Sequence, residues 1–337
     1  MTALSILDLV RVTEQTTARE AMDNARDVAG HAEALGFRRF WVAEHHNMRG
    51  IASAATSVVI AHIAAGTKTI RVGAGGIMLP NHAPLVIAEQ FGTLATLFGN
   101  RIDLGLGRAP GTDQLAMQAL RRDPRSAEHF PQDVLELQAL LAAPQPGQQI
   151  VAVPGAGTEV PLWILGSSTF GARLAAELGL PYAFASHFAP DALDEALRTY
   201  RTFFKPSKQL AQPYAMAGVN IIAARTDAEA RRLATTQQMS STNMLRNARG
   251  LSKPPIDDIE SYWTPLEKVH VQRKLACSIV GSPETVRAGI ERFLERTNAD
   301  ELMIVSDIFD HTARLRSFEL MADVANTVAA AEPASRR

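Results

Sequence analysis

The segment Phe40–Asn47, with the sequence FWVAEHHN, passes directly from bulky apolar side chains to a carboxylate and two imidazoles. Phe, Trp and Val favour a buried β-strand, whereas packing gives no reason for Glu44, His45 and His46 to follow at once. Titratable groups at the carboxyl end of a strand are typical of active sites in α/β proteins. The segment therefore predicts a strand over Phe40–Val42 that ends at a functional site.

Apolar runs of strand length alternate with segments of helical periodicity along the rest of the chain. Strands are predicted at Leu4–Leu9, Phe40–Val42, Thr69–Ala74, Ile102–Leu106, Leu162–Leu165, Tyr182–Ala185, Ala217–Ala223 and Glu301–Val305. Helices are predicted at Thr17–Leu35, Ala52–Ala65, Pro84–Phe98, Pro124–Leu141, Phe170–Leu178, Ala192–Phe204, from Asp227 onward, Pro283–Glu295 and His311–Ala330. Eight alternating units favour a closed (β/α)8 TIM barrel with insertions, formed by residues 1–337 as a single domain.

The segment 240–277 does not fit a minimal barrel. It contains the Pro254-Pro255 pair, polar patches and the large aromatic residues Tyr262 and Trp263. Long irregular excursions in compact domains often form lids or binding loops, and a merely decorative surface insertion fits this pattern about as well. The segment is therefore a candidate lid or insertion.

The composition limits the class of protein. Hydrophobic residues make up 46% and charged residues 20%, and 34 Lys and Arg balance 35 Asp and Glu, so nothing indicates nucleic-acid or membrane binding. The single cysteine, Cys277, excludes an intramolecular disulfide and fits a reducing compartment. The first apolar run contains Asp8 and lacks a basic flank, unlike a signal peptide, and no apolar run has the length of a membrane span. We expect a soluble, cytoplasmic protein.

Glycine-rich segments follow the third and fourth predicted strands. The first reads GAGGIMLP over Gly73–Pro80, and the second reads GLGRAPG over Gly105–Gly111. Glycine at a strand end lets a ligand lie on bare backbone, although a simple turn is the plainer explanation. Arg108 adds a planar cation suited to a phosphate. The second segment is not a dinucleotide-binding motif, because Pro110 would interrupt the helix that receives the pyrophosphate.

Hydroxyl groups and a further histidine follow the fifth and sixth predicted strands. Ser167 and Ser168 lead straight into a helix, where they fit an ordinary N-cap, but hydroxyls and free amides at a helix start also bind phosphate. His187 is open to either a substrate contact or a structural hydrogen bond. No metal site is expected, because the chain lacks an HExxH motif or similarly clustered ligands.

Several of these motifs together resemble the bacterial luciferase-like flavin monooxygenases. They occur in the family's order, within a similarity that runs from about Leu4 to about Val324. The sequences of His82–Pro84 and Arg108–Asp113 are similar to those of family members that have unknown substrates and do not emit light. The motifs that carry the resemblance are WVAEHH at Trp41–His46, VGAGGIMLP at Val72–Pro80, EQF at Glu89–Phe91, RIDLGLGR at Arg101–Arg108, GSS at Gly166–Ser168 and VGSPE at Val280–Glu284.

The resemblance implies a (β/α)8 barrel that binds FMN, reduced by a separate flavin reductase, and uses it with O2 to oxygenate a small organic substrate. His45 matches the family's catalytic histidine beside the flavin. Gly75 and Gly76 match the pair that packs against the isoalloxazine, often through a non-prolyl cis peptide. Glu44 and His187, on the same rim, are the candidate substrate contacts.

The phosphate of FMN is expected in the second half of the site. Arg108, Ser168 and the amide near Gly171 match the family's phosphate-binding groups, with Gly107 and Ser167 as further cofactor contacts. The light-emitting enzymes place a reactive cysteine at the position of Gly107 and a glutamate at that of Ser167, so light emission is not expected here.

Two other functions stay open at this point. The family also includes dehydrogenases that use the deazaflavin F420 and transfer hydride without oxygen, and nothing in the quoted residues excludes them. A non-catalytic flavin-binding protein would retain the same pocket, although His45 argues against it.

The second and third predicted helices favour self-association. The segments 52–65 and 85–97 are rich in alanine and apolar on more than one face, which suggests a partner beyond the barrel strands. The luciferase-like family also pairs subunits through this side of the barrel. We therefore expect a homodimer, against the alternative of a monomer whose neighbouring helices cover this face.

Overall fold

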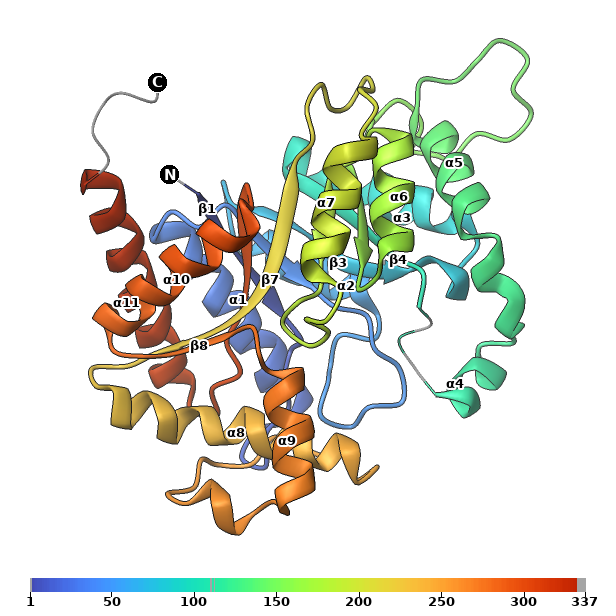
Figure 1. The fold of residues 1–337 in the computed structure, drawn as a ribbon. Coiled ribbons are helices and arrows are strands. Elements are labelled where there is room, and N and C mark those ends of the chain that lie inside the picture. The colour runs from blue at the N-terminus through green and yellow to red at the C-terminus, as the bar shows by residue number, and fades with distance from the viewer. Residues whose placement is uncertain (1, 110, 112, 332–337) are drawn as a thin grey trace.

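Eight parallel strands close into a barrel in the computed structural model, which describes residues 2–109, 111 and 113–331 (Figure 1). The ring closes because β1 pairs with both β2 and β9, while β6 pairs with β7. The barrel strands are β1 (Ala3–Asp8), β2 (Arg39–Val42), β3 (Arg71–Met78), β4 (Ile102–Gly107), β5 (Leu162–Gly166), β6 (Tyr182–Phe184), β7 (Ala215–Ala223) and β9 (Glu301–Val305). The expected TIM barrel is confirmed.

Helices surround the barrel, and α8 and α9 lie beyond the carboxyl ends of the strands, at the bottom of Figure 1. None of the helices in the described residues is both long and apolar enough to span a membrane. The α-helices are α1 (Ala18–Ala34), α2 (Thr56–Ala65), α3 (Pro84–Phe98), α4 (Gln114–Ala119), α5 (Phe130–Leu141), α6 (Thr169–Leu178), α7 (Leu193–Phe203), α8 (Asp227–Leu245), α9 (Pro265–Lys274), α10 (Pro283–Thr297) and α11 (His311–Ala331). Short 3-10 helices are η1 (Leu79–Asn81), η2 (Gly99–Arg101), η3 (Pro124–Glu128) and η4 (Ile259–Ser261).

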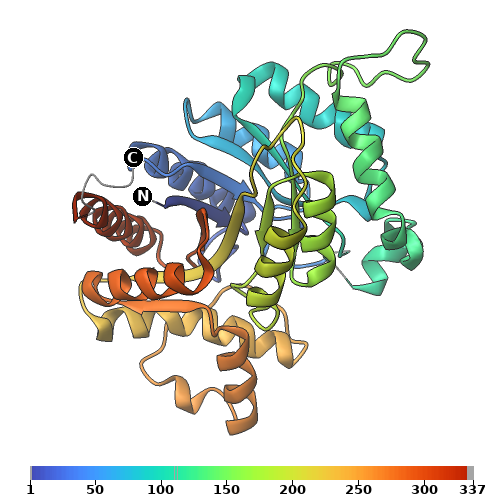
Figure 2. The ribbon, with the colours of Figure 1, turned by 45° about the horizontal axis from the view of Figure 1, so that its top comes forward.

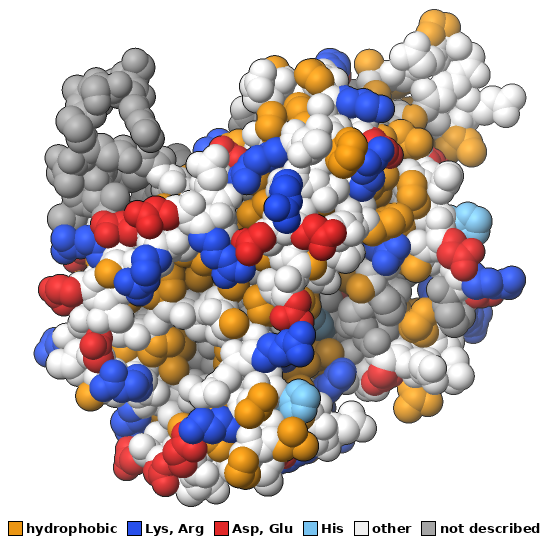
Figure 3. Space-filling view, in the orientation of Figure 1, with side chains coloured by type: hydrophobic (Ala, Val, Ile, Leu, Met, Phe, Trp, Pro, Cys, Tyr) orange, Lys and Arg blue, Asp and Glu red, His pale blue; other side chains and the backbone are white. Residues whose placement is uncertain are grey.

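Local sequence explains where the helices begin and which side they bury. Thr17 and Glu20 form a reciprocal capping box at the start of α1, and Thr264 and Glu267 form one at the start of α9. Alanine and valine recur at helical spacing on the buried side of α1, so this helix packs closely on the strands. Over the face in Figure 3, acidic and basic side chains are interspersed, as the nearly balanced charge predicts.

Several predicted boundaries differ from the structure. The predicted helix over Pro124–Leu141 is split into η3 and α5, with a break at His129 just before Pro131, and the predicted helix at 52–65 begins only at Thr56. Strand β3 continues past its predicted end, through Gly75 and Gly76, to Met78. The helix α4 was not predicted. Pro110 and Thr112, in the Arg108–Asp113 stretch quoted for the resemblance, lie outside the described residues.

A ninth strand, β8 (Ser278–Gly281), was also missed by the sequence analysis. It pairs with the carboxyl half of β7, where Asn220 is aligned with Ser278 on one edge and with Val305 on the other. Since β6 pairs with the start of β7 on the edge opposite β9, β8 extends the wall beyond the short strand β6. The strand β8 therefore borders the carboxyl end of the barrel without closing it.

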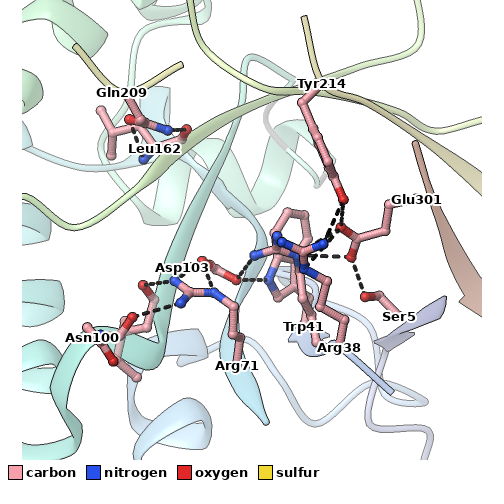
Figure 4. A network of polar contacts seen from close by, with 12 residues as sticks. Ser5, Arg38, Trp41, Arg71, Asn100, Asp103, Leu162, Gln209, Tyr214 and Glu301 are labelled. Carbon is pink, nitrogen blue, oxygen red and sulfur yellow. Dashed lines mark hydrogen bonds and ion pairs between the residues drawn. The ribbon is translucent and has the colours of Figure 1, made fainter. Parts of the chain in front are cut away.

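Charged side chains fill the amino end of the barrel interior. Arg39 is 5% exposed and donates hydrogen bonds to Asp103 (2.7 Å) and Glu301 (2.9 Å), both fully buried. Burial alone lowers the pKa of Arg39, but the two carboxylates outweigh it and raise the pKa. Figure 4 shows how Arg71 and Tyr214 satisfy the remaining oxygens of the two acids. The network joins β2, β4 and β9 across the barrel.

Aromatic side chains form the next layer of the interior. Trp41 and Trp163 meet edge to face, with ring centroids 5.1 Å apart, and Trp41 Nε1 donates to Asp103. Gly75 makes room for this layer, because a Cβ there would lie 2.9 Å from the Trp41 ring. The barrel is therefore solid up to this level, and open space begins only toward the carboxyl ends of the strands.

We expect Arg39→Met to lower the free energy of unfolding by about 3–5 kcal/mol, because it leaves two buried carboxylates without their shared cation. Urea denaturation at neutral pH measures the change. Arg19→Met is the matched control, since Arg19 has a side chain 91% exposed and pairs with Asp23 on the helix surface. A variant at position 39 as stable as the control would contradict the proposed importance of this network.

Candidate functional site

A cavity of about 380 Å³ opens at the carboxyl ends of the barrel strands. Its lining comes from strands and loops around the whole barrel and from the ends of α8 and α9. This end carries the active site in TIM-barrel enzymes, and the volume is that of a pocket for a small organic ligand. The candidate site therefore lies where the sequence analysis expected it.

Eight of the ten predicted site residues line this cavity. Gly76 and Glu44 do not. Gly76 is joined to the lining residue Gly75 by a cis peptide bond, as the resemblance implied. The lining residues among those predicted are His45, Gly75, Gly107, Arg108, Ser167, Ser168, Gly171 and His187.

One corner of the cavity combines a cation with the start of α6. The Arg108 guanidinium lies over the Phe170 ring, 4.0 Å from its centroid. Ser168 is the N-cap of α6, yet its side chain makes no capping hydrogen bond, so within the described residues the first amides of the helix lack a side-chain acceptor. A phosphate would be accepted here by the guanidinium, the hydroxyl and these amides. This donor set fits the phosphate of a flavin nucleotide.

His45 projects from the loop after β2 and lines the cavity. Burial and the nearby positive charge of Arg11 lower the pKa of His45 to about 4. The imidazole is therefore neutral at pH 7, with one nitrogen able to donate and the other to accept. Among the described residues, its buried Nδ1 has no hydrogen-bond partner, which leaves this atom for a ligand or water.

Glu44 lies behind His45 and is fully buried. Its carboxylate accepts hydrogen bonds from His46 Nε2 (2.8 Å), His82 Nε2 (2.9 Å) and the amide of Met78 (3.0 Å). Burial alone raises the pKa of Glu44, but the hydrogen bonds from the two histidines outweigh it and bring the pKa to about 2. The carboxylate thus ties the loop after β2 to the end of β3, and its placement favours a positioning role over the predicted substrate contact.

His187, after β6, faces the cavity from the opposite side. Burial, together with Lys274 and His45, lowers its pKa to about 3, so this imidazole is also neutral. Its carbonyl oxygen accepts a hydrogen bond from the Asn220 amide (2.6 Å), and Asn220 accepts one from Gln237 (2.6 Å). The amide pair fixes the loop that carries His187.

Polar lining residues that the sequence analysis did not single out include Arg11, Asn220, Lys274 and Asp307. Arg11 and Asp307 follow β1 and β9 and form an ion pair of 3.2 Å. Placement after a strand, the rule that found His45, would have found both. Asn220 lies within β7, and Lys274 ends α9, in the segment whose structure was not predicted. Nothing in the local sequence marked these two.

The candidate lid segment 240–277 takes part in the cavity wall. Ser240, Ser241 and Met244 on α8, with Lys274 and Leu275 at the end of α9, line the cavity. Whether the segment moves as a lid stays a prediction. The described residues contain no cluster of three or more His, Cys, Asp or Glu side chains arranged to hold a metal ion.

Comparisons with known proteins agree with this geometry. The family model of luciferase-like monooxygenases matches residues 2–301. The chain is 53% identical to a luciferase-like monooxygenase of Escherichia coli (strain K12), over 96% of both chains. It is 30% identical to the N-acetyl-S-alkylcysteine monooxygenase of Bacillus subtilis (strain 168), over 96% of this chain and 98% of that one.

Solved structures share the fold. The crystal structure of apo-MsnO8 is 35% identical, with a TM-score of 0.87 over 97% of this chain and 99% of that one. More distant fold neighbours include a 3,6-diketocamphane monooxygenase component in complex with FMN (TM-score 0.71, 16% identity, 95% and 96% covered). Another is an F420-dependent secondary alcohol dehydrogenase (TM-score 0.68, 15% identity, 94% and 97% covered). The barrel, the cavity at its carboxyl end and these matches together establish that the chain belongs to the luciferase-like monooxygenase family.

Proposed function

We propose that this protein is an FMN-dependent monooxygenase that receives reduced flavin from a separate reductase and uses it with O2 on a small organic substrate. The observation that carries the proposal is the corner formed by Arg108, Ser168 and the start of α6, at one end of a cavity whose other side holds His45. A phosphate at the corner would direct a flavin ring across Gly75 toward that histidine. The monooxygenase relatives support oxygen as the oxidant.

The side chains around the cavity define what the protein contributes. Bound reduced flavin would supply the activation of O2. The walls on the ring side are apolar, with Leu7, Trp41, Leu165 and Met303 among them, and so exclude water from a reactive centre. His45, held by its anchored loop, would donate or accept one hydrogen bond in its neutral form at the reacting atoms.

Arg108→Ala should weaken FMN binding by about 1.5–3 kcal/mol, roughly 10-fold to 150-fold, because a charge-assisted contact to the phosphate is lost. Riboflavin has no phosphate and should bind the variant almost as it binds the wild type. Fluorescence titration with both flavins measures the difference. Equal losses of affinity for FMN and riboflavin would show that Arg108 does not bind the phosphate.

The same titration with F420 separates the two cofactors. We expect FMN to bind and F420 not to compete with it. Tight binding of F420, together with alcohol-dependent reduction of that cofactor without O2, would replace the proposal with a hydride-transferring dehydrogenase. The protein could instead bind FMN but oxygenate no substrate in the presence of a generic flavin reductase. This result would indicate a non-catalytic flavin-binding protein.

His45→Ala should lower turnover about 10²–10⁴-fold while FMN affinity changes little, since the imidazole acts at the reacting atoms. Because the pKa of His45 is about 4, the neutral form prevails above it, and the activity that depends on this form should fall only as the pH drops through about 4. His62→Ala is the control, as His62 pairs with Asp23 on the surface. Wild-type turnover in the His45→Ala variant would show that this histidine has only a structural role.

We further propose a homodimer built on α2 and α3. Val58 on α2 is 67% exposed, and Val86 and Leu97 on α3 are 43% and 66% exposed, although both helices also bury an apolar face in the barrel. Exposed apolar residues on two neighbouring helices fit an isologous contact about a two-fold axis.

Light scattering should give twice the chain mass of 36.5 kDa at micromolar concentration. The double variant Val58→Asp/Leu97→Asp should shift the protein to monomers, because it places charges in the apolar contact. Val269→Asp is the control, since Val269 is 61% exposed on α9, far from this face in sequence and element. A monomeric wild type would refute the proposed dimer.

A further inference from the structure

The positively charged side chains of the cavity lie at two separate places. Its charged lining residues are Arg11, Arg108, Lys274 and Asp307, and both lining histidines are neutral. The strand order places Arg108, after β4, three strands around the eight-strand ring from Arg11, which follows β1. One cation therefore serves the phosphate corner, and two lie at the far end of the cavity.

The acid at the far end neutralises only one of these two cations. Asp307 pairs with Arg11 at 3.2 Å. Among the described residues, Lys274 has no carboxylate partner, and its ammonium donates only to the sulfur of Met244 (3.3 Å). Burial, together with the positive charges of Arg11 and Arg249, lowers the pKa of Lys274. An ammonium that is partly removed from water and surrounded by like charges is unfavourable unless an anion joins it.

The surroundings of Lys274 limit which anion fits. One unneutralised charge matches a singly charged group, whereas a phosphate dianion would call for more donors. Met244 and Leu275 supply an apolar surface beside the ammonium, and the amides of Gln237 and Asn220 also line the cavity. This combination fits a carboxylate on an apolar carbon skeleton.

We propose that the substrate is a small organic carboxylate, held at its anionic end by Lys274 with Arg11 beside it. The rest of the molecule then lies on Met244 and Leu275 and extends toward His45 and the flavin ring. This inference rests on the proposed function for the reaction, but the binding site itself stands on residues that do not contact the phosphate corner. Lys274 is here a specificity-determining residue that selects for the charge of the substrate.

The test compares hexanoate with hexanamide, which differ in charge but have nearly the same shape. Calorimetric titration uses the full chain, alone and loaded with FMN. Wild type should bind hexanoate at least tenfold more tightly than hexanamide. Lys274→Met should abolish that preference while hexanamide affinity stays unchanged, and Lys274→Arg should retain most of it. Lys268→Met is the matched control, because Lys268 is on the same helix but pairs with Glu260.

Two results of the binding titrations would overturn the proposal. Equal binding of the carboxylate and the amide by wild type, including no binding of either up to their solubility limits, would remove the anion site. A loss of FMN affinity greater than that of riboflavin in Lys274→Met would assign the lysine to the cofactor. Failure of FMN to bind, with the preference for hexanoate intact, would instead refute the proposed function and leave the carboxylate site standing.

Folding is controlled in the same experiment. Since Lys274 has no carboxylate partner among the described residues, Lys274→Met should melt at or above the wild-type temperature. Hexanoate should raise the melting temperature of wild type and leave that of Lys274→Met unchanged, because only the wild type binds it in the folded state. Stabilisation of both proteins to the same degree would contradict the assignment.

Discussion

The buried guanidinium of Arg39 is the constraint on which the rest of the barrel depends. It lies between Asp103 and Glu301, so β2, β4 and β9 meet around one charge in the interior. Such a group is unfavourable unless every polar atom around it is paired, and the pairs to Arg71, Trp41, Ser5 and Tyr214 do this. The register of these strands is thereby tied to hydrogen-bond geometry as well as to apolar packing.

That register fixes what happens at the other end. Residues two apart on a strand face the same side, so Arg39, Trp41 and Ala43 project inward at successive levels. The charge network takes the first level and the tryptophans the second, which leaves small residues and open space at the third. His45 follows just beyond. The depth of the cavity is therefore a consequence of how the amino end is filled.

The sequence predicted the barrel and eight of the residues that line the cavity because both depend on local rules. Alternating periodicities located the elements, and polar residues directly after strands located His45, Arg108 and Ser168. It missed β8, a four-residue strand that periodicity does not distinguish from a loop. Glu44, the predicted substrate contact, is hydrogen-bonded to His46 and His82, an arrangement that a sequence alone does not specify, and its contact with a substrate stays a prediction. Lys274 depends on tertiary packing and left no local pattern.

The short strand β6 has a wider consequence. Because β6 stops after three residues, the wall above it is completed by β8, a strand outside the closed ring that directly follows α9. The end of α9, where Lys274 and Leu275 line the cavity, is thus attached to an appendage of the ring, whereas the loops that carry His45, Arg108 and Ser168 follow strands of the ring itself. Substitutions in the appendage can therefore change the lining of this part of the cavity without disturbing the closure of the barrel. The two parts of the cavity wall can evolve separately.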